Sequence, residues 1–236
     1  MNYDLVIFDW DGTVMDSTAR IVECMHSAGR DLDLPVLDDD TVRGIIGLGL
    51  PEAIRTLYPD IDDPMLGRMR DRYAFHFVAA EATPSRLYPH AEATLAALRD
   101  AGLRLAVATG KSRKGLDRVW GNAGLGHWFH ASRCADESRS KPHPAMVEEL
   151  LLELAVRPER ALVVGDTSFD LEMARSAGVD RVGVSYGAHP VDRLMTFEPL
   201  AVIDALPQLL PVVGLPGTLN ASDLNTSEEC DDGRQQ

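Results

Sequence analysis

The chain has 236 residues, of which 45% are hydrophobic and 25% charged, and its formal net charge is −14. These fractions predict a packed core in one large domain, or in a core domain with a smaller insertion. The acidic balance disfavours binding to nucleic-acid phosphates, and no apolar run is long enough to cross a bilayer. The N-terminus also lacks the features of a secretory signal, so we expect a cytoplasmic protein with neither nucleic acid nor membrane as a partner.

The three cysteines of the chain are widely spaced and form no C-x-x-C pair. An odd number of cysteines without such pairs indicates neither a disulfide framework nor a thiolate metal site. We therefore expect reduced thiols without a role in the chemistry.

The first predicted element is a strand at residues 5–8, LVIF, and the acidic stretch DWDGT follows it directly. Residues 16–85 then contain no convincing strand, and Pro35, Pro51, Pro59 and Pro64 divide them into several helical patterns. This segment is too long to be a connecting loop. We expect a small helical-bundle cap inserted after strand one.

Strand and helix patterns alternate after this insertion. Helical spacing marks residues 90–102, 144–156 and 169–178, and strand runs lie at 103–109, 160–165 and 181–185, with weaker runs near 128–132 and at 201–203. The strong runs are continuously apolar, as in strands that are buried on both faces. The alternation predicts an α/β fold with a doubly wound parallel sheet, a Rossmann-like core.

These patterns divide the chain into three parts. The α/β core is expected at residues 1–15 and 86–212, and the helical cap at 16–85. The remaining residues, 213–236, form a polar and acidic tail almost without aromatic side chains. Such a composition cannot bury enough apolar surface to fold, so we expect the tail to be disordered.

Chemically active side chains follow the ends of the predicted strands. They are Asp9 and Asp11 after the first strand, Thr109, Gly110 and Lys111 after the second, Lys141 ahead of the helix at 144–156, and Asp166 and Asp170 after the strand at 160–165. Ligands bind at the carboxyl ends of parallel strands, so these groups are expected at one edge of the sheet. Each acid or threonine alone is commonly a helix cap. Their joint occurrence in this order favours an active site.

The same motifs resemble those of the haloacid dehalogenase superfamily, in particular its phosphatases with a small helical cap. DWDGT at 9–13 matches the first motif, VATG at 107–110 the second, KP at 141–142 the third and GDTSFD at 165–170 the last. The resemblance covers residues 1–212, and within the superfamily the chain is most similar to phosphoglycolate phosphatases. It implies a Mg²⁺-dependent phosphatase that hydrolyses a small phosphorylated metabolite through an aspartyl-phosphate, with phosphoglycolate as the favoured substrate.

The resemblance implies a role for each acid. Asp9 is the nucleophile, and Asp11 protonates the leaving alkoxide and then activates water. Dehalogenases need no acid at the second position because a halide leaves without a proton, so Asp11 favours phosphoryl transfer. The magnesium ligands are expected to be Asp9, the backbone carbonyl of Asp11, and Asp166. Asp170, one helical turn after Asp166, is expected to orient Lys141 or a water on the metal.

The remaining polar groups are expected to bind the anionic substrate. Thr109 and the amide of Gly110 would hold phosphoryl oxygens, helped by the helix that begins behind them. Lys141 would offset the negative charge of Asp9 and the phosphate. Lys111 is expected to reach a carboxylate or phosphate of the substrate.

The cap contains a second set of candidates in RGIIGLGL at residues 43–50. Arg43, Gly47 and Gly49 could contact the substrate, and the alternative interpretation is a glycine-rich helix junction with a solvated arginine. Asp16 and Ser17 are expected to mark the hinge and to cap the first inserted helix, without a catalytic role.

Two alternative functions stay open at this point. A sugar phosphomutase, similar to β-phosphoglucomutase, would use the same aspartyl-phosphate but pass the phosphoryl group to a second hydroxyl. A phospho-switch module similar to a receiver domain also combines acids, a threonine and a lysine on a parallel sheet, but it is shorter and has adjacent acids. A monomer is the default expectation for the assembly.

Overall fold

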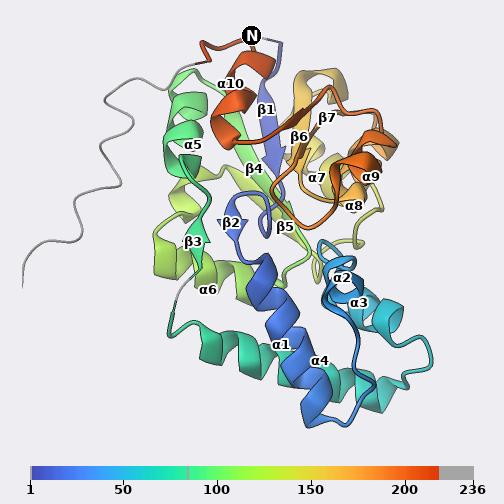
Figure 1. Cartoon of the computed structure of the whole chain (residues 1–236). Helices are drawn as coiled ribbons and strands as arrows, with labels where there is room; N and C mark the ends of the chain where they lie inside the picture. The colour runs from blue at the N-terminus through green and yellow to red at the C-terminus, as the bar shows by residue number, and fades with distance from the viewer. Residues whose placement is uncertain (1, 84, 218–236) are drawn as a thin grey trace, which may run out of the picture.

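A six-stranded parallel sheet forms the centre of the computed structural model, which describes residues 2–83 and 85–217 (Figure 1). The strands lie in the order β5-β4-β1-β6-β7-β8, and each pairs with its neighbours in parallel. Their bounds are Leu5–Phe8 for β1, Arg104–Thr109 for β4, Ala131–Cys134 for β5, Ala161–Gly165 for β6, Asp180–Val184 for β7 and Ala201–Ile203 for β8. The prediction of a doubly wound α/β sheet is confirmed.

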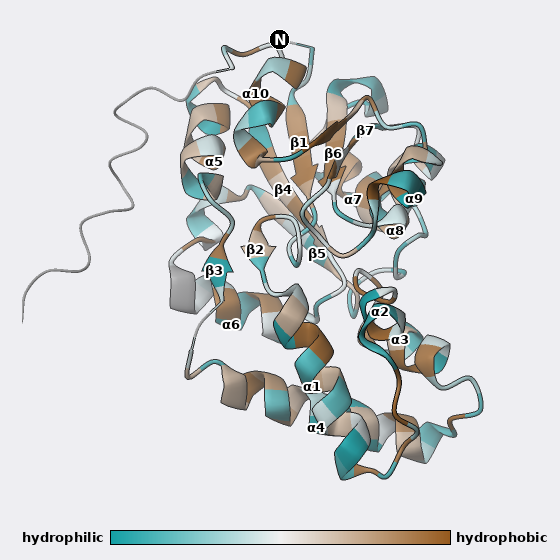
Figure 2. Ribbon diagram, in the orientation of Figure 1, coloured by the Kyte–Doolittle hydropathy of each residue, from teal (hydrophilic) through white to brown (hydrophobic). Residues whose placement is uncertain are grey.

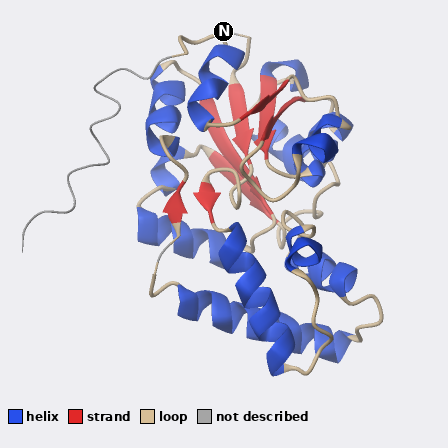
Figure 3. Cartoon of the chain, viewed as in Figure 1, coloured by secondary structure: helices blue, strands red, loops and turns tan. Residues whose placement is uncertain are grey.

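Helices cover both faces of this sheet (Figure 3). The helices of the core are α5 (Ala91–Asp100), α6 (Arg113–Ala123), α7 (Ala145–Glu153), α8 (Ser168–Ser176), α9 (Val191–Met195) and α10 (Leu209–Val212). Val6 and Phe8 pack with α5, α6 and α10, whereas Leu5 and Ile7 pack with α7 and α8 on the opposite face. Because successive side chains of a strand point to opposite faces, a strand covered on both sides is apolar throughout, as Figure 2 shows for the central strands.

Four helices lie between β1 and α5 along the chain, and we call them the cap helices. They are α1 (Thr18–Asp31), α2 (Asp39–Arg43), α3 (Leu50–Leu57) and α4 (Asp63–Ala80). They share a buried cluster of their own, to which Met25, Ile54 and Met69 belong. A short antiparallel pair, β2 (Met15–Asp16) with β3 (Arg86–Leu87), lies where the chain enters and leaves this segment. The helical prediction for residues 16–85 agrees with these elements, and their status as a separate domain stays a prediction.

Local sequence signals explain where two of the cap helices begin. The side chain of Asp38 accepts a hydrogen bond from the amide of Thr41, and that of Asp62 accepts one from the amide of Met65. These carboxylates satisfy amides that have no partner within the helix. Within the described residues, no helix combines the length and the apolar composition that crossing a membrane requires.

The structure departs from the sequence-based expectations at the strand expected near 128–132 and at the start of the expected tail. The weak strand expected near 128–132 begins later, at Ala131, because residues 126–128 form a 3₁₀ turn and Trp128 and Phe129 pack beside the core instead. In the expected tail, Val213 is fully buried and the amide of Leu215 bonds the carbonyl of Leu210. Residues 218–236, where most of the predicted disorder falls, lie outside the described residues.

Candidate active site

The candidate site lies at the carboxyl ends of three adjacent strands. β1 pairs with β4 on one side and with β6 on the other. Asp9 follows the last residue of β1, Thr109 ends β4, and Asp166 follows the last residue of β6. Since neighbouring parallel strands end at the same edge, residues more than 150 positions apart in sequence become neighbours here.

Lys141 links two of the acids. Its Nζ lies 2.5 Å from Oδ1 of Asp9 and 2.6 Å from Oδ1 of Asp170, and all three side chains are buried. Burial disfavours the charged ammonium, but Asp170 and Asp9 outweigh this effect and raise the pKa of Lys141. The lysine is therefore a permanently charged group that holds one oxygen of Asp9 in place.

Asp170 is held by the start of α8 as well as by Lys141. Its Oδ2 accepts hydrogen bonds from the amide of Thr167 at 3.0 Å and from the hydroxyl of Thr167 at 2.6 Å. Thr167, the N-cap residue of α8, accepts in return from the amide of Asp170, so the two residues form a capping box. This arrangement fixes the carboxylate that faces Lys141.

Three buried carboxylates meet beside this lysine. One side-chain oxygen from each of Asp9, Asp166 and Asp170 lies within 4.8 Å of the other two. Burial raises the pKa of Asp9 to about 7, with Asp170 and Asp11 adding to the increase and Lys141 opposing it. Burial, followed by the charges of Asp9 and Asp170, also raises the pKa of Asp166 well above its ordinary value. If all three carboxylates were ionised, their negative charge would exceed the positive charge of Lys141.

This charge excess and the donor atoms fit a divalent cation. Oδ2 of Asp9 is buried and has no hydrogen-bond partner within the described chain. Carboxylate oxygens are hard ligands of the kind that Mg²⁺ prefers. The residues present therefore fit the group that the resemblance implies, with Asp9 and Asp166 as the expected ligands and Asp170 within the same reach.

Asp166 is fixed by glycine-rich backbone on two sides. Its Oδ2 accepts from the amide of Ala188 at 2.7 Å, and its Oδ1 accepts from the hydroxyl of Thr13 at 3.1 Å. A Cβ on Gly12 would lie 2.2 Å from Oδ2, and one on Gly187 would lie 2.1 Å from Cβ of Asp166. Gly12 also has φ of +90°, which side chains disfavour. Both glycines leave the space that this carboxylate occupies.

Asp11 points to a different set of partners. Its Oδ1 accepts from the hydroxyl of Ser17 at 2.5 Å, and its Oδ2 lies 3.0 Å from Nζ of Lys111. The ammonium of Lys111 lies 4.5 Å from the centre of the Phe77 ring on α4. Ser17 is the N-cap residue of α1, as expected, but its side chain bonds Asp11 and not an amide of the helix. Asp16 pairs with Arg86 in the short β2–β3 ladder.

The expected phosphate-binding residues follow β4. The hydroxyl of Thr109 is buried and accepts from the amide of Lys111 at 3.2 Å. Gly110 lines the cavity described below, and α6 begins beyond it, with Ser112 as its N-cap. The roles of Thr109, Gly110 and Lys111 toward a substrate stay predictions.

The loop between α2 and α3 approaches the core closely. A Cβ on Gly110 would lie 2.4 Å from the carbonyl oxygen of Leu48. The amide of Gly49 donates to the hydroxyl of Ser140 at 2.8 Å, one residue before Lys141. These contacts close the cap helices over the strand ends.

His189 joins the same loop to the acidic motif, and the sequence interpretation missed it. Its Nδ1 accepts from the amide of Ser168 at 3.0 Å, and its Nε2 lies 3.1 Å from the carbonyl oxygen of Gly44. Burial, with Arg193 nearby, lowers the pKa of His189 to about 4, so the ring is neutral and donates from Nε2. A lone histidine outside any motif offers no signal for this contact in the sequence.

Substituting Gly110 tests this close approach. Gly110→Ala is expected to lower the free energy of unfolding by about 1–3 kcal/mol, because the new methyl group must displace the backbone at Leu48. Urea denaturation measures this change. Gly121→Ala, where a Cβ meets nothing within 4 Å on α6, is the matched control and is expected to be neutral or slightly stabilising. Equal stability of the two variants would contradict the packing of the loop against Gly110.

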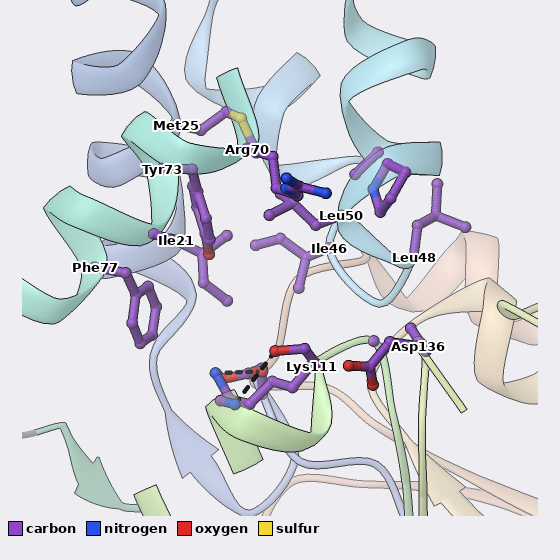
Figure 4. Close-up of a pocket in the computed structure, with 18 of the residues that line it drawn as sticks. Ile21, Met25, Ile46, Leu48, Leu50, Arg70, Tyr73, Phe77, Lys111 and Asp136 are labelled. Carbon is purple, nitrogen blue, oxygen red and sulfur yellow. Dashed lines mark hydrogen bonds and ion pairs between the residues drawn. The ribbon is translucent and has the colours of Figure 1, made fainter. Parts of the chain in front are cut away.

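A cavity of about 710 Å³ lies between the cap helices and the strand ends (Figure 4). Asp9, Asp11 and Gly110 line its floor, and residues of α1, α4 and the α2–α3 loop line the rest. Of the candidates in the cap, Gly47 lines the cavity, whereas Arg43 and Gly49 are not among the lining residues. Asp9 and Asp11, for which the resemblance implies the roles of nucleophile and acid, thus line a space that can receive a substrate.

The chain is similar to known proteins along most of its length. Residues 6–184 match the family model described as haloacid dehalogenase-like hydrolase. "Probable phosphatase IndB" of Dickeya dadantii is 34% identical over 210 residues, which cover 87% of this chain and 91% of that protein. Phosphoglycolate phosphatase of Vibrio vulnificus is 30% identical over 217 residues, covering 89% and 95%.

A solved structure agrees with the sequence comparisons. The crystal structure of a predicted phosphoglycolate phosphatase from Haemophilus somnus superposes with a TM-score of 0.82 at 27% identity, covering 90% of this chain and 98% of the other. The family match extends from the first strand to β7 and includes each motif that carries the buried acids. The chain therefore belongs to the haloacid dehalogenase-like hydrolase family.

Proposed function

We propose that this protein is a Mg²⁺-dependent phosphomonoester hydrolase that works through an aspartyl-phosphate. Its family of hydrolases and its relatives named as phosphatases support a phosphatase. The observation that carries the mechanism is the buried Oδ2 of Asp9, which has no partner among the described residues and belongs to a side chain on the cavity floor.

In the first step, a carboxylate oxygen of Asp9 attacks phosphorus. Lys141 holds this carboxylate in place through Oδ1, and the side chain lines the cavity floor. As the new O–P bond forms, the bond between phosphorus and the alcohol oxygen breaks, and the leaving alkoxide takes a proton from Asp11. Asp11 is oriented for this transfer by Ser17 and Lys111.

In the second step, water cleaves the acyl phosphate. The ionised Asp11 takes a proton from the attacking water, and cleavage of the acyl phosphate releases inorganic phosphate. Asp9 is then a free carboxylate again, and Asp11 is protonated as it was before the first step. Closure of the α2–α3 loop over the floor limits the access of bulk water, so that one oriented molecule reacts.

The metal supplies charge neutralisation for an anionic nucleophile that attacks an anionic phosphate. Asp9 and Asp166 would hold it, together with the backbone carbonyl of Asp11. Lys141, itself held by Asp170, would keep the Asp9 carboxylate in position beside the metal.

Replacing Asp166 tests the metal site. Asp166→Ala is expected to raise the Mg²⁺ concentration for half-maximal activity by about 100-fold, because one of the buried carboxylate ligands is lost. Titration calorimetry with Mg²⁺ measures the same loss without turnover. Asp204→Ala, an exposed acid outside the cluster, is the control and is expected to leave both titrations unchanged. An unchanged metal titration in Asp166→Ala would remove this residue from the ligand set.

A panel of phosphomonoesters, assayed for released phosphate with Mg²⁺ and with a chelator, tests the reaction itself. We expect turnover that requires Mg²⁺. Phosphoglycolate belongs in this panel because relatives carry its name, whereas the relative from Dickeya dadantii is named as a phosphatase without a substrate. Absence of released phosphate from every ester would overturn the proposal.

A sugar phosphomutase is the alternative on the same scaffold. It would transfer the phosphoryl group from Asp9 to a second hydroxyl of the sugar. Product analysis with a hexose phosphate separates the two reactions, since a phosphatase releases free phosphate and a mutase yields an isomer without it.

A further inference from the structure

The cavity above the catalytic floor is larger than a phosphoryl group requires. Its volume is about 710 Å³, within the range of roughly 300–1,000 Å³ that is typical of pockets for drug-sized ligands. A phosphoryl group bound at Asp9 and Gly110 would fill only the floor. A two-carbon acid such as glycolate would leave most of the remaining space to water.

The surface that faces this floor is apolar. The cap helices and the α2–α3 loop contribute Ile21, Met25, Ile46, Leu48, Tyr73 and Phe77 to the lining, and Figure 4 shows these side chains around the space above Lys111. The rings of Tyr73 and Phe77, one turn apart on α4, have centroids 5.7 Å apart with 35° between their planes. Aromatic and aliphatic groups of this kind bind a ring by burial and by aromatic contacts.

The cations near the cavity are mostly engaged with acids of the protein. Lys111 pairs with Asp11 at 3.0 Å, and Arg118 pairs with Glu81 at 2.8 Å. Arg70 lies 3.2 Å from its neighbour Asp71, but both side chains are largely exposed, so this pair is weak. Lys114, at the start of α6, is also exposed to solvent. On the floor itself Lys111 is already paired, so a second carboxylate on a small substrate would compete with Asp11 for it.

We infer that the preferred substrates are phosphomonoesters of a primary alcohol whose organic part is bulky and apolar, with an aromatic ring that packs against Tyr73 and Phe77. This inference rests on the proposed phosphatase reaction and specifies its substrate class. The phosphoryl group lies over Asp9 and Gly110, and the ring enters the space lined by α1, α4 and the α2–α3 loop. Phosphoglycolate uses the same floor but none of the apolar surface.

Three esters with comparable alkoxide leaving groups separate these possibilities. Ethyl phosphate, phenethyl phosphate and phosphoglycolate are compared by their kcat/KM values with the full chain and saturating Mg²⁺. Because the phenyl ring is buried on binding, phenethyl phosphate is expected to show a kcat/KM value about 10- to 100-fold above that for ethyl phosphate. Phosphoglycolate is expected to stay near ethyl phosphate.

Variants of α4 test whether the preference for the phenethyl ester arises from this part of the cavity. Tyr73→Ala removes part of the aromatic surface, and Ala74→Trp fills the cavity from an exposed position that lines it. Each is expected to lower the ratio between the phenethyl and ethyl esters toward one. Phe75→Ala is the matched control, because Phe75 is an aromatic residue of the same helix that is 57% exposed and outside the lining. It is expected to keep the ratio of the unaltered protein.

The outcomes distinguish the two proposals. If ethyl phosphate or phosphoglycolate is hydrolysed as well as or better than phenethyl phosphate, the substrate class is wrong while the phosphatase stands. If Phe75→Ala lowers the ratio as much as Tyr73→Ala, the ring does not bind where we infer. If no ester releases phosphate, the proposed function itself fails.

Discussion

Asp9→Asn is expected to lower turnover by about four orders of magnitude or more, because an amide oxygen is a poor nucleophile toward phosphorus. Asparagine has nearly the same shape and removes one of three buried negative charges, so the fold is expected to persist. Phosphate release measures turnover, and urea denaturation measures stability.

Two control variants accompany this experiment. Asp60→Asn, an exposed aspartate ahead of α4, is expected to keep both activity and stability. Asp9→Ala excludes activity that arises from hydrolysis of the new amide back to aspartate, and mass spectrometry of Asp9→Asn checks the same point. Full turnover in Asp9→Ala would end the assignment of Asp9 as the nucleophile.

Lys141→Met is expected to have the second large effect, on both stability and activity. It removes the cation from two buried carboxylates, Asp9 and Asp170, and unpairing a buried charge costs about 3–5 kcal/mol. The free energy of unfolding is expected to fall by that amount in chelator and to recover in part with Mg²⁺, which the same acids would bind. Turnover is expected to fall by about 100-fold or more, because Oδ1 of Asp9 loses its positioning group.

An exposed ion pair provides the reference for the loss of stability in Lys141→Met. Arg55→Met breaks the pair between Arg55 and Asp63, whose side chains are largely exposed, and is expected to cost less than about 1 kcal/mol. A loss in Lys141→Met no larger than that of Arg55→Met would show that the buried acids do not depend on the lysine.

Some features of the site follow from local sequence. Asp9 and Asp166 come directly after apolar strands, and parallel strands end at one edge, so their meeting could be expected from the pattern alone. Asp170, four residues after Asp166, could be expected on the same side of the helix start. The family resemblance added the chemical roles, which geometry by itself does not assign.

Other features depend on contacts that no local pattern encodes. The ion pair of Lys111 with Asp11 and the bridge that His189 makes to the α2–α3 loop join distant segments of the folded chain. The sequence suggested Ser17 as a helix cap because serine is common there, and Ser17 does occupy the N-cap position of α1, but its hydroxyl bonds the nearby Asp11.

The amino-acid pattern predicts the order of strands and helices along the chain, the helical character of residues 16–85 and the acids that follow β1 and β6. These features can be predicted because periodicity and strand ends are local properties of the chain. The folded chain was needed to establish how the α2–α3 loop closes on Gly110, which partners orient Asp11, and how apolar the cavity above them is. These features depend on how the cap helices are placed against the sheet, and that placement results from many distant contacts acting together.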